Sequence, residues 1–182
     1  GPISSNNDGA RCGYAPVNID FGDAPSNYGI LLNANGARHG VASGLSIGII
    51  TDADDDGIAG ALANGDDSNG SDDEDGLTSS IIVSPLATTF TLTVPVTNTS
   101  FATAKLFGWI DFNLDGIFQT SEGTSVAAPS SSSVTLTWNS ITPTIGTSYL
   151  RLRLSSDANL TTSTPNGAMQ NGEVEDYLIT IA

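Results

Sequence analysis

Apolar and polar residues alternate along most of the chain with a period of two, which is typical of half-buried strands, and no segment keeps the 3.6-residue period of a helix. The alternation is clearest over residues 90–96, 134–138, 150–154 and 177–181. Shorter apolar stretches cover 45–50, 81–83 and 105–112. About seven strands joined by turns rich in glycine, asparagine, serine and proline predict an all-β fold, an antiparallel β-sandwich with long calcium-binding loops.

Proline 95 interrupts one of these alternating segments. Because proline has no N–H to donate to a neighbouring strand, we expect this segment to be an edge strand or to carry a bulge.

The length of 182 residues fits one domain with a sizeable core. Residues 1–18 lack periodicity and form an N-terminal segment, and Gly1-Pro2 resembles the scar that a protease leaves after removal of a tag. We expect residues 19–182 to form a single β-sandwich domain, cut from a longer protein whose signal and anchor lie elsewhere. No apolar run is long enough to cross a bilayer.

The charge is strongly unbalanced, with 20 Asp and Glu residues against 5 Lys and Arg and a net charge of −15. Such a chain repels phosphates, so nucleic acid and anionic membranes are excluded as natural partners. Ten of the 20 acids lie between Asp52 and Asp75. Crowded carboxylates are destabilising unless they are solvated, protonated or neutralised by cations, and Ca²⁺ prefers oxygen ligands. We therefore expect several calcium ions.

Residues 111–122 match the twelve-residue calcium-loop pattern D-x-N-x-D-G with an acid at position twelve. The loop follows a predicted strand rather than a helix, so it would be an EF-hand-like loop on a β scaffold. Gly116 permits the sharp turn that the pattern requires. The alternative is a solvated polar turn. The expected ligands are the side chains of Asp111, Asn113 and Asp115, the Ile117 carbonyl and both oxygens of Glu122.

A second, weaker copy of the pattern begins at Asp52 and includes Asp54, Asp56 and Gly57, but its position twelve is Ala63. A carboxylate from elsewhere would have to close this site, and the alternative is a solvated acidic loop. The candidates for closing it are Asp66, Asp67, Asp72, Asp73, Glu74, Asp75, Glu173, Glu175 and Asp176.

Acidic residues also open the last predicted strand. Alternation places Glu173 and Glu175 on one face with Tyr177, and Val174 and Asp176 on the other. Carboxylates at the margin of a core carry a desolvation cost. A structural metal that joins this strand to the acidic loop would remove that cost.

The stretch Gly172-Glu173-Val174-Glu175-Asp176-Tyr177 spells the name of the GEVED domain, and the chain resembles that family in further motifs in the same order from about residue 19 to 181. This resemblance implies an extracellular, calcium-binding β-sandwich of bacterial surface and secreted proteins. The chain also looks like the ligand-binding modules of long RTX adhesins, some of which bind peptides. The further matching motifs lie at 20–25, 52–57, 64–67, 72–76, 108–116 and 151–155.

Catalytic patterns are weak, and we expect no enzyme. Residues 44–48 match G-x-S-x-G, but an acidic loop follows instead of a helix, and the only histidine, His39, precedes the serine. A glycosidase would need a free pair of acids, whereas every acid pair here falls in a metal-like pattern. His39 is expected to be structural, hydrogen-bonded in a loop or to a carboxylate.

Five other side chains have two interpretations each. Trp109 and Trp138 are expected in the core, with a sugar-stacking platform as the alternative. Arg151 and Arg153 are expected at the surface or as partners of carboxylates. The single cysteine, Cys12, is either an inert thiol or a bridge to a neighbouring domain.

The leading hypothesis is a calcium-dependent, peptide-binding module of a bacterial RTX-type adhesin, secreted or at the cell surface and monomeric within a larger chain. Its partner would be a peptide or protein terminus, or a glycan, on a target cell. Residues beside the acidic loop are the candidate ligand contacts: Gly65, Asp66, Asp67 and Asp72. The alternatives are a calcium-stiffened spacer and a carbohydrate-binding module.

Overall fold

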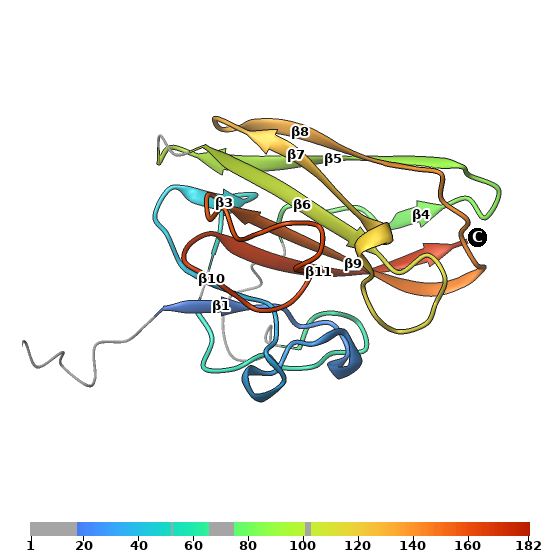
Figure 1. The fold of residues 1–182 in the computed structure, drawn as a ribbon, viewed down its shortest axis with the longest axis horizontal. Coiled ribbons are helices and arrows are strands. Elements are labelled where there is room, and N and C mark those ends of the chain that lie inside the picture. The colour runs from blue at the N-terminus through green and yellow to red at the C-terminus, as the bar shows by residue number, and fades with distance from the viewer. Residues whose placement is uncertain (1–17, 52, 66–74, 101–102) are drawn as a thin grey trace, which may run out of the picture.

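The computed structural model describes residues 18–51, 53–65, 75–100 and 103–182, and Figure 1 shows their fold. The prediction of an all-β sandwich is confirmed. A five-stranded sheet has the order β4 (Ile81–Val83), β11 (Glu173–Ile181), β9 (Gly146–Ser155), β6 (Ala104–Ile110) and β7 (Gly123–Ala128). A three-stranded sheet has the order β3 (Leu45–Ile47), β5 (Thr89–Asn98) and β8 (Ser132–Asn139).

A small third sheet lies against the larger one and belongs to the N-terminal part of the chain. It consists of β1 (Ile19–Phe21), β2 (Arg38–Gly40) and β10 (Ala168–Met169). The described helical turns are short 3-10 segments, namely η1 (Ser26–Tyr28), η2 (Leu32–Ala34) and η3 (Thr120–Glu122). None of these described turns is long enough to cross a membrane.

Every segment predicted from the two-residue period contains a strand, whereas β1, β2, β7 and β10 are not predicted. Most neighbouring strands are antiparallel, but β4 runs parallel to β11, and β10 runs parallel to β2. The expectation of a wholly antiparallel sandwich is therefore too simple. Long connections bring β4 and β10 to the sheet edges, where the alternation of side chains carries no information about strand direction.

Pro95 lies in β5, which is the middle strand of the sheet β3-β5-β8. At Pro95, however, the pairing of β5 with β3 ends. The strand β3 pairs only with residues 96–98 of β5, and the N–H of Gly48 donates to the Pro95 carbonyl at 2.9 Å. Residues 89–95 therefore have β8 on one side and no described strand on the other.

The main core lies between the two larger sheets and follows from the alternation. Every second residue of β9, Leu150, Leu152 and Leu154, faces the smaller sheet and is fully buried. Leu136 and Trp138 of β8 pack against them from the other sheet. Burying apolar side chains of this size stabilises the fold by roughly 1.5–3 kcal/mol each.

The opposite face of the five-stranded sheet is buried as well, because residues 19–40 and the segment 160–169 cover it. A second apolar cluster forms there around Trp109 and Phe107 of β6, with Tyr28 and Ile30 from the covering segment. Both faces of the five-stranded sheet are therefore shielded from solvent. As a result, the polar side chains of β9, which alternate with the leucines and point to the opposite face, are also buried.

Candidate metal centre

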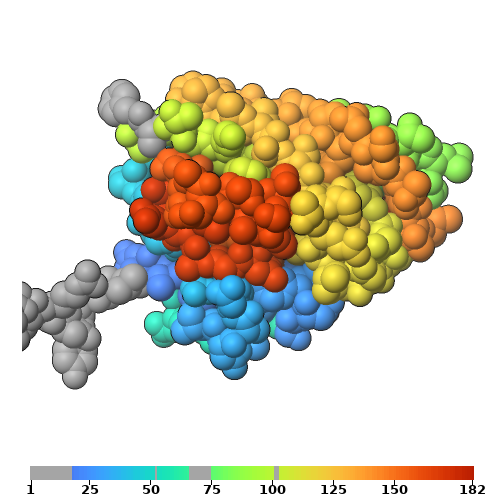
Figure 2. All heavy atoms as spheres, viewed as in Figure 1, coloured from blue at the N-terminus to red at the C-terminus, as the bar shows by residue number. Residues whose placement is uncertain are grey.

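The loop 111–122 continues directly from β6 and ends in η3, before β7 begins. Asp111 still follows the path of the strand, since its N–H donates to the Tyr149 carbonyl at 3.3 Å. Figure 2 shows the yellow segment that contains the loop at the surface, beside the blue N-terminal segment. The contact between them includes a hydrogen bond from Asn27 Nδ2 to the Gly116 carbonyl at 2.7 Å.

The carboxylate of Asp111 is fully buried and holds the loop closed. Its Oδ2 accepts from Tyr28 OH at 2.7 Å and from the Gly116 N–H at 2.9 Å, and its Oδ1 accepts from the Asp115 N–H at 3.2 Å. Burial raises the pKa of the Tyr28 phenol well above its usual range, and the hydrogen bond to Asp111 raises it further. Asp111 therefore ties the loop to the segment that covers the sheet.

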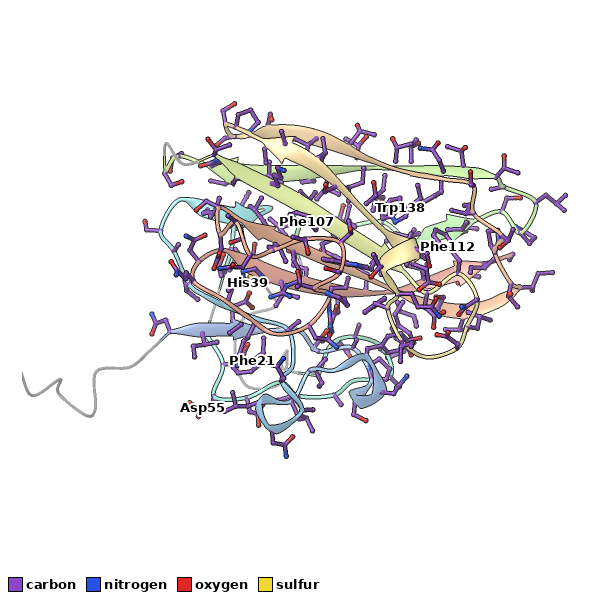
Figure 3. All side chains as sticks on the ribbon, in the orientation of Figure 1. Phe21, His39, Asp55, Phe107, Phe112 and Trp138 are labelled. Carbon is purple, nitrogen blue, oxygen red and sulfur yellow. The ribbon has the colours of Figure 1, made fainter. Side chains whose placement is uncertain are left out.

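The other end of the loop, Glu122, is also buried and reaches back toward its start. Its Oε1 accepts from the Phe112 N–H at 2.9 Å, and its Oε2 accepts from the Gln119 N–H at 3.0 Å. Burial is the main reason that the pKa of Glu122 is raised to about 7, and the charge of Asp111 raises it as well. Figure 3 labels Phe112 and Trp138 near this end of the loop, where Trp138 Nε1 donates to the Glu122 carbonyl at 2.8 Å.

The two central donors, Asn113 and Asp115, are exposed. The Asp115 N–H donates to Asn113 Oδ1 at 2.9 Å, and Asp115 Oδ1 accepts from the Ile117 N–H at 3.2 Å. Two residues adopt left-handed backbone, Leu114 with φ 60° and Gly116 with φ 85°. A left-handed leucine is uncommon, and here it lies between the two exposed residues, at the bend of the loop.

The donor set of this loop fits calcium in its chemistry and its order. All four side chains offer oxygen, which hard cations prefer. Within the described part of the chain, however, no three Asp, Glu, His or Cys side chains are already grouped around a common point. The carboxylates of Asp111 and Glu122 instead accept backbone N–H groups of the loop.

The second predicted loop lies against the N-terminal segment. Asp54 Oδ2 accepts from the Phe21 N–H at 3.3 Å, and Asp56 Oδ1 accepts from the Leu32 N–H at 2.6 Å. Gly65 donates its N–H to Asp23 Oδ2 at 2.7 Å. Six of the residues predicted for this region lie outside the described residues, namely Asp52, Asp66, Asp67, Asp72, Asp73 and Glu74, and so does Cys12.

Glu173 and Glu175 point into the main core with Tyr177, as alternation predicts, because they pair with Leu154, Leu152 and Leu150 of β9. Both are fully buried.

The carboxylates of these two residues are held by backbone N–H groups. Glu173 accepts from the Ile47 N–H, and Glu175 accepts from the Gly76 N–H at 3.2 Å and from Tyr177 OH at 2.7 Å. Asp75 precedes Gly76 and accepts from the N–H groups of Ile49 and Ile50 at 2.9 and 3.1 Å. The last strand, β3 and the end of the acidic segment thus meet at one place.

Asp176 does not join that group, because it faces the other side of the sheet. It forms a two-point ion pair with Arg151, with Nε to Oδ1 at 2.8 Å and Nη2 to Oδ2 at 2.7 Å, and both side chains are fully buried. The interpretation of Arg151 as a carboxylate partner is confirmed, and a surface position is wrong for both arginines. The N-terminal segment covers this face of the sheet, which the strand pattern by itself does not reveal.

Arg153 is the second buried guanidinium, and its hydrogen bonds go to the His39 ring and to backbone carbonyls. Its Nε donates to His39 Nε2 at 2.9 Å, so the other ring nitrogen of His39 carries the proton and donates to the Asn171 carbonyl at 2.8 Å. Burial, followed by the charge of Arg151, lowers the pKa of Arg153 to about 9. Burial and then Arg153 also lower the pKa of His39 well below its usual value. His39 is thus structural, as expected (Figure 3).

Both tryptophans are core residues. Trp109 is fully inaccessible and donates Nε1–H to the Thr162 carbonyl at 2.9 Å, and Trp138 is 3% exposed. The alternative of a sugar-stacking platform on these two side chains is therefore wrong. Neither ring has a free face for a sugar.

Comparisons with known proteins agree with the motifs. Residues 105–180 match the family model of the GEVED domain. No curated protein matches the chain. A crystal structure of a CARDB domain from Pyrococcus furiosus, in complex with di-metal ions, shares 14% sequence identity with a TM-score of 0.34, covering 56% of this chain and 84% of that one. The matched residues 105–180 contain the loop 111–122, and this part of the chain is similar to the GEVED domain, a domain of bacterial surface-type proteins.

Proposed function

We propose that the chain is a calcium-dependent, peptide-binding module of a bacterial RTX-type adhesin, which attaches its parent protein to a partner outside the cell. The observation that supports this most is the loop 111–122, in which all donors are oxygens. Its first and last carboxylates are buried, whereas Asn113 and Asp115 are exposed. An ion held there would contact the buried carboxylates on one side and would face solvent on the other.

The residues that would hold calcium are Asp111, Asn113, Asp115, Glu122 and the Ile117 carbonyl. When bound, Ca²⁺ supplies positive charge that offsets the carboxylates and attracts oxygens of a ligand. Asp111 and Glu122 carry out a second task, because their hydrogen bonds to loop N–H groups fix where the exposed donors lie. The Asp54 and Glu175 regions are further candidate sites.

A hollow of about 170 Å³ adjoins the loop and has room for a small chemical group of a ligand. Asn113, Gln119 and Glu122 provide polar walls, and Phe112 and Ile141 provide apolar ones. This volume is below the roughly 300–1,000 Å³ of typical small-molecule sites. It suits one terminal residue of a peptide, whose carboxylate needs a nearby cation in a chain with a net charge of −15.

Calcium binding is tested by calorimetry and thermal unfolding of the metal-free chain with added Ca²⁺. Extracellular sites bind with dissociation constants of roughly 10⁻⁴–10⁻³ M. At ten times that concentration one site adds about 1.4 kcal/mol of stability. For a domain of this size we expect Tm to rise by about 3–6 °C.

The variant Asp115→Ala should lose most of that calcium-dependent rise, because it removes one exposed donor without touching the core. Thr120→Ala, in the same loop but at a non-ligand position, should keep it. Asp111→Ala is less informative, since the lost bonds to Tyr28 and Gly116 lower Tm in EDTA as well. No heat on adding Ca²⁺ and no effect of EDTA on Tm would refute calcium binding.

Ligand binding is tested separately with a peptide library in calcium and in EDTA, comparing free C-termini with amidated ones. The proposal expects binding that needs both calcium and the free carboxylate. Binding that ignores both would contradict it. If the chain releases or absorbs heat on adding Ca²⁺ but binds no peptide, the alternative of a calcium-stiffened spacer is favoured. The hydrogen bond between Tyr28 and Asp111 of the loop also supports that alternative.

A further inference from the structure

A hollow of the described structure lies away from the loop 111–122, between an edge of each large sheet. It has a volume of about 510 Å³. One wall is the segment 76–82, which includes β4, and the other is the open part of β5 with Phe90, Leu92, Thr93 and Pro95. None of the described residues that line it is charged, and none belongs to the loop 111–122. We call it the edge groove.

The backbone of β5 faces the edge groove with hydrogen-bonding groups. In an antiparallel pair, the N–H and C=O of alternate residues point to the same neighbour. The bond from Gly48 N–H to the Pro95 carbonyl shows that odd-numbered residues of β5 point toward β3. Beyond the end of β3, the backbone groups of Thr91 and Thr93 therefore point into the groove, where no described strand pairs with them.

The side chains that line the groove alternate in the same way. Phe90 and Leu92 are half-buried and line the wall formed by β5, whereas Thr91 and Thr93 are exposed, and Thr93 borders the groove. On the opposite wall, Ile82 of β4 is 64% exposed. A segment lying in the groove would therefore meet apolar side chains on one of its faces and solvent on the other.

We propose that the edge groove binds an extended peptide, which adds to β5 as an extra strand with apolar residues at every second position and a positive net charge. Only a polypeptide in strand conformation offers N–H and C=O groups at the spacing of Thr91 and Thr93. The positive charge of the peptide is expected because it would complement the negative charge of the chain. The chain carries −15, and Asp75 directly precedes Gly76, the first residue of the groove wall. This surface is independent of calcium and does not rest on the function proposed above.

The probe is a blocked heptapeptide of alternating valine and threonine with a lysine at each end, labelled for fluorescence anisotropy and titrated in EDTA. Two control peptides have the same length. One carries a methyl group on every central amide nitrogen, which removes the hydrogen-bond donors, and the other has glutamate in place of lysine. We expect at least tenfold weaker binding of the methylated peptide and several-fold weaker binding of the glutamate peptide.

The matched variants are Thr93→Pro and Thr93→Ala. Both lose the side-chain contact of Thr93 Oγ1 with Thr135 Oγ1 at 3.0 Å, but only proline removes the N–H that faces the groove. We expect Thr93→Pro to weaken peptide binding at least tenfold and Thr93→Ala to change it less than about twofold. Amide exchange of the unaltered chain provides a measurement that does not depend on the variants, and it should slow at Thr91 and Thr93 when peptide is added.

Three results would overturn the proposal: equal binding of the methylated peptide, no added protection at Thr91 and Thr93, or equal effects of the two Thr93 variants. Sedimentation, which measures the oligomeric state, supplies a fourth result that would overturn it. If the chain dimerises and Thr93→Pro abolishes the dimer, the edge belongs to a second copy of the chain and not to a foreign peptide.

Discussion

Two arginine side chains are fully buried beneath the N-terminal segment, and their partners differ in charge. Arg151 is neutralised by Asp176, and its Nη1 also donates to Asn166 Oδ1 at 2.7 Å. The hydrogen bonds of Arg153 go to His39 and to backbone carbonyls, and the charges of Asp20 and Asp176 also act on it. Buried ion pairs contribute little net stability, but removing one partner costs about 3–5 kcal/mol. This layer therefore makes the correct docking of the N-terminal segment a requirement of the fold.

The neutral state of His39 leads to a prediction about pH. In the unfolded chain the histidine binds a proton below its usual pKa of about 6.5, whereas in the folded chain burial, and then the charge of Arg153, lower the pKa of His39 well below that value. Folding stability should therefore fall as pH drops below about 6.5, by up to about 1.4 kcal/mol per pH unit. Above that pH the residue contributes no pH dependence.

The measurement is urea unfolding at pH 7.5 and 5.0, with His39→Gln as the control. Glutamine can accept the bond from Arg153 and does not titrate. Between the two pH values the unaltered chain should lose roughly 2 kcal/mol more than the variant. An equal loss in both proteins would show that His39 is protonated without penalty.

At the scale of elements, the loop 111–122 is already shaped before any ion is considered. Its turns rest on the left-handed residues Leu114 and Gly116 and on the hydrogen bonds to Asp111. Part of the entropic cost of ordering this loop around an ion, as proposed, is thereby met by the fold itself.

Gly116→Ala tests this shape. With φ at 85°, a Cβ adds strain of roughly 1–2 kcal/mol, and it would lie 2.7 Å from Asn27 Nδ2. We expect a stability loss of that size in EDTA by chemical unfolding, whereas Ser121→Ala in the same loop should stay within about 0.5 kcal/mol. If Gly116→Ala unfolds at the same urea concentration as the unaltered chain, residue 116 does not need the left-handed conformation.

For the whole molecule, the dominant quantity is the net charge of −15. Repulsion among carboxylates opposes the compact state, and salt screens it. Many of the described acids lower this cost locally by accepting N–H bonds, as Asp54, Asp56, Asp75 and Glu175 do. The remaining repulsion acts over the whole surface.

Screening should therefore stabilise the chain even without calcium. In EDTA, raising NaCl from 20 to 500 mM should increase Tm by about 2–4 °C, which corresponds to roughly 1 kcal/mol for a domain of this size. Calcium at the same ionic strength should add a further rise, which NaCl cannot replace. A Tm that is unchanged or lower at high salt would show that charge repulsion does not limit stability.

Much of the fold was predictable from residues that act locally. The two-residue period of the leucines in β9 placed one face in the core, and the register of β11 followed for Glu173 and Glu175. The pattern also named the oxygen-bearing residues of 111–122, because a calcium loop draws its ligands from one short segment, and calcium binding there stays a prediction. The parallel partners β4 and β10 left no such pattern, since strand direction depends on distant connections.

The sequence by itself determined the sandwich and the order of donors in the loop, because alternation and short-range spacing are properties of neighbouring residues. Only the tertiary structure decided that Arg151 and Arg153 are buried, since residues 164–167 fold back over them and residues 28–39, more than 100 residues away in the chain, complete the cover. It also decided that β5 keeps an open edge, because that depends on where β3 stops pairing. Burial and edges are set by contacts between distant segments, and no local pattern encodes them.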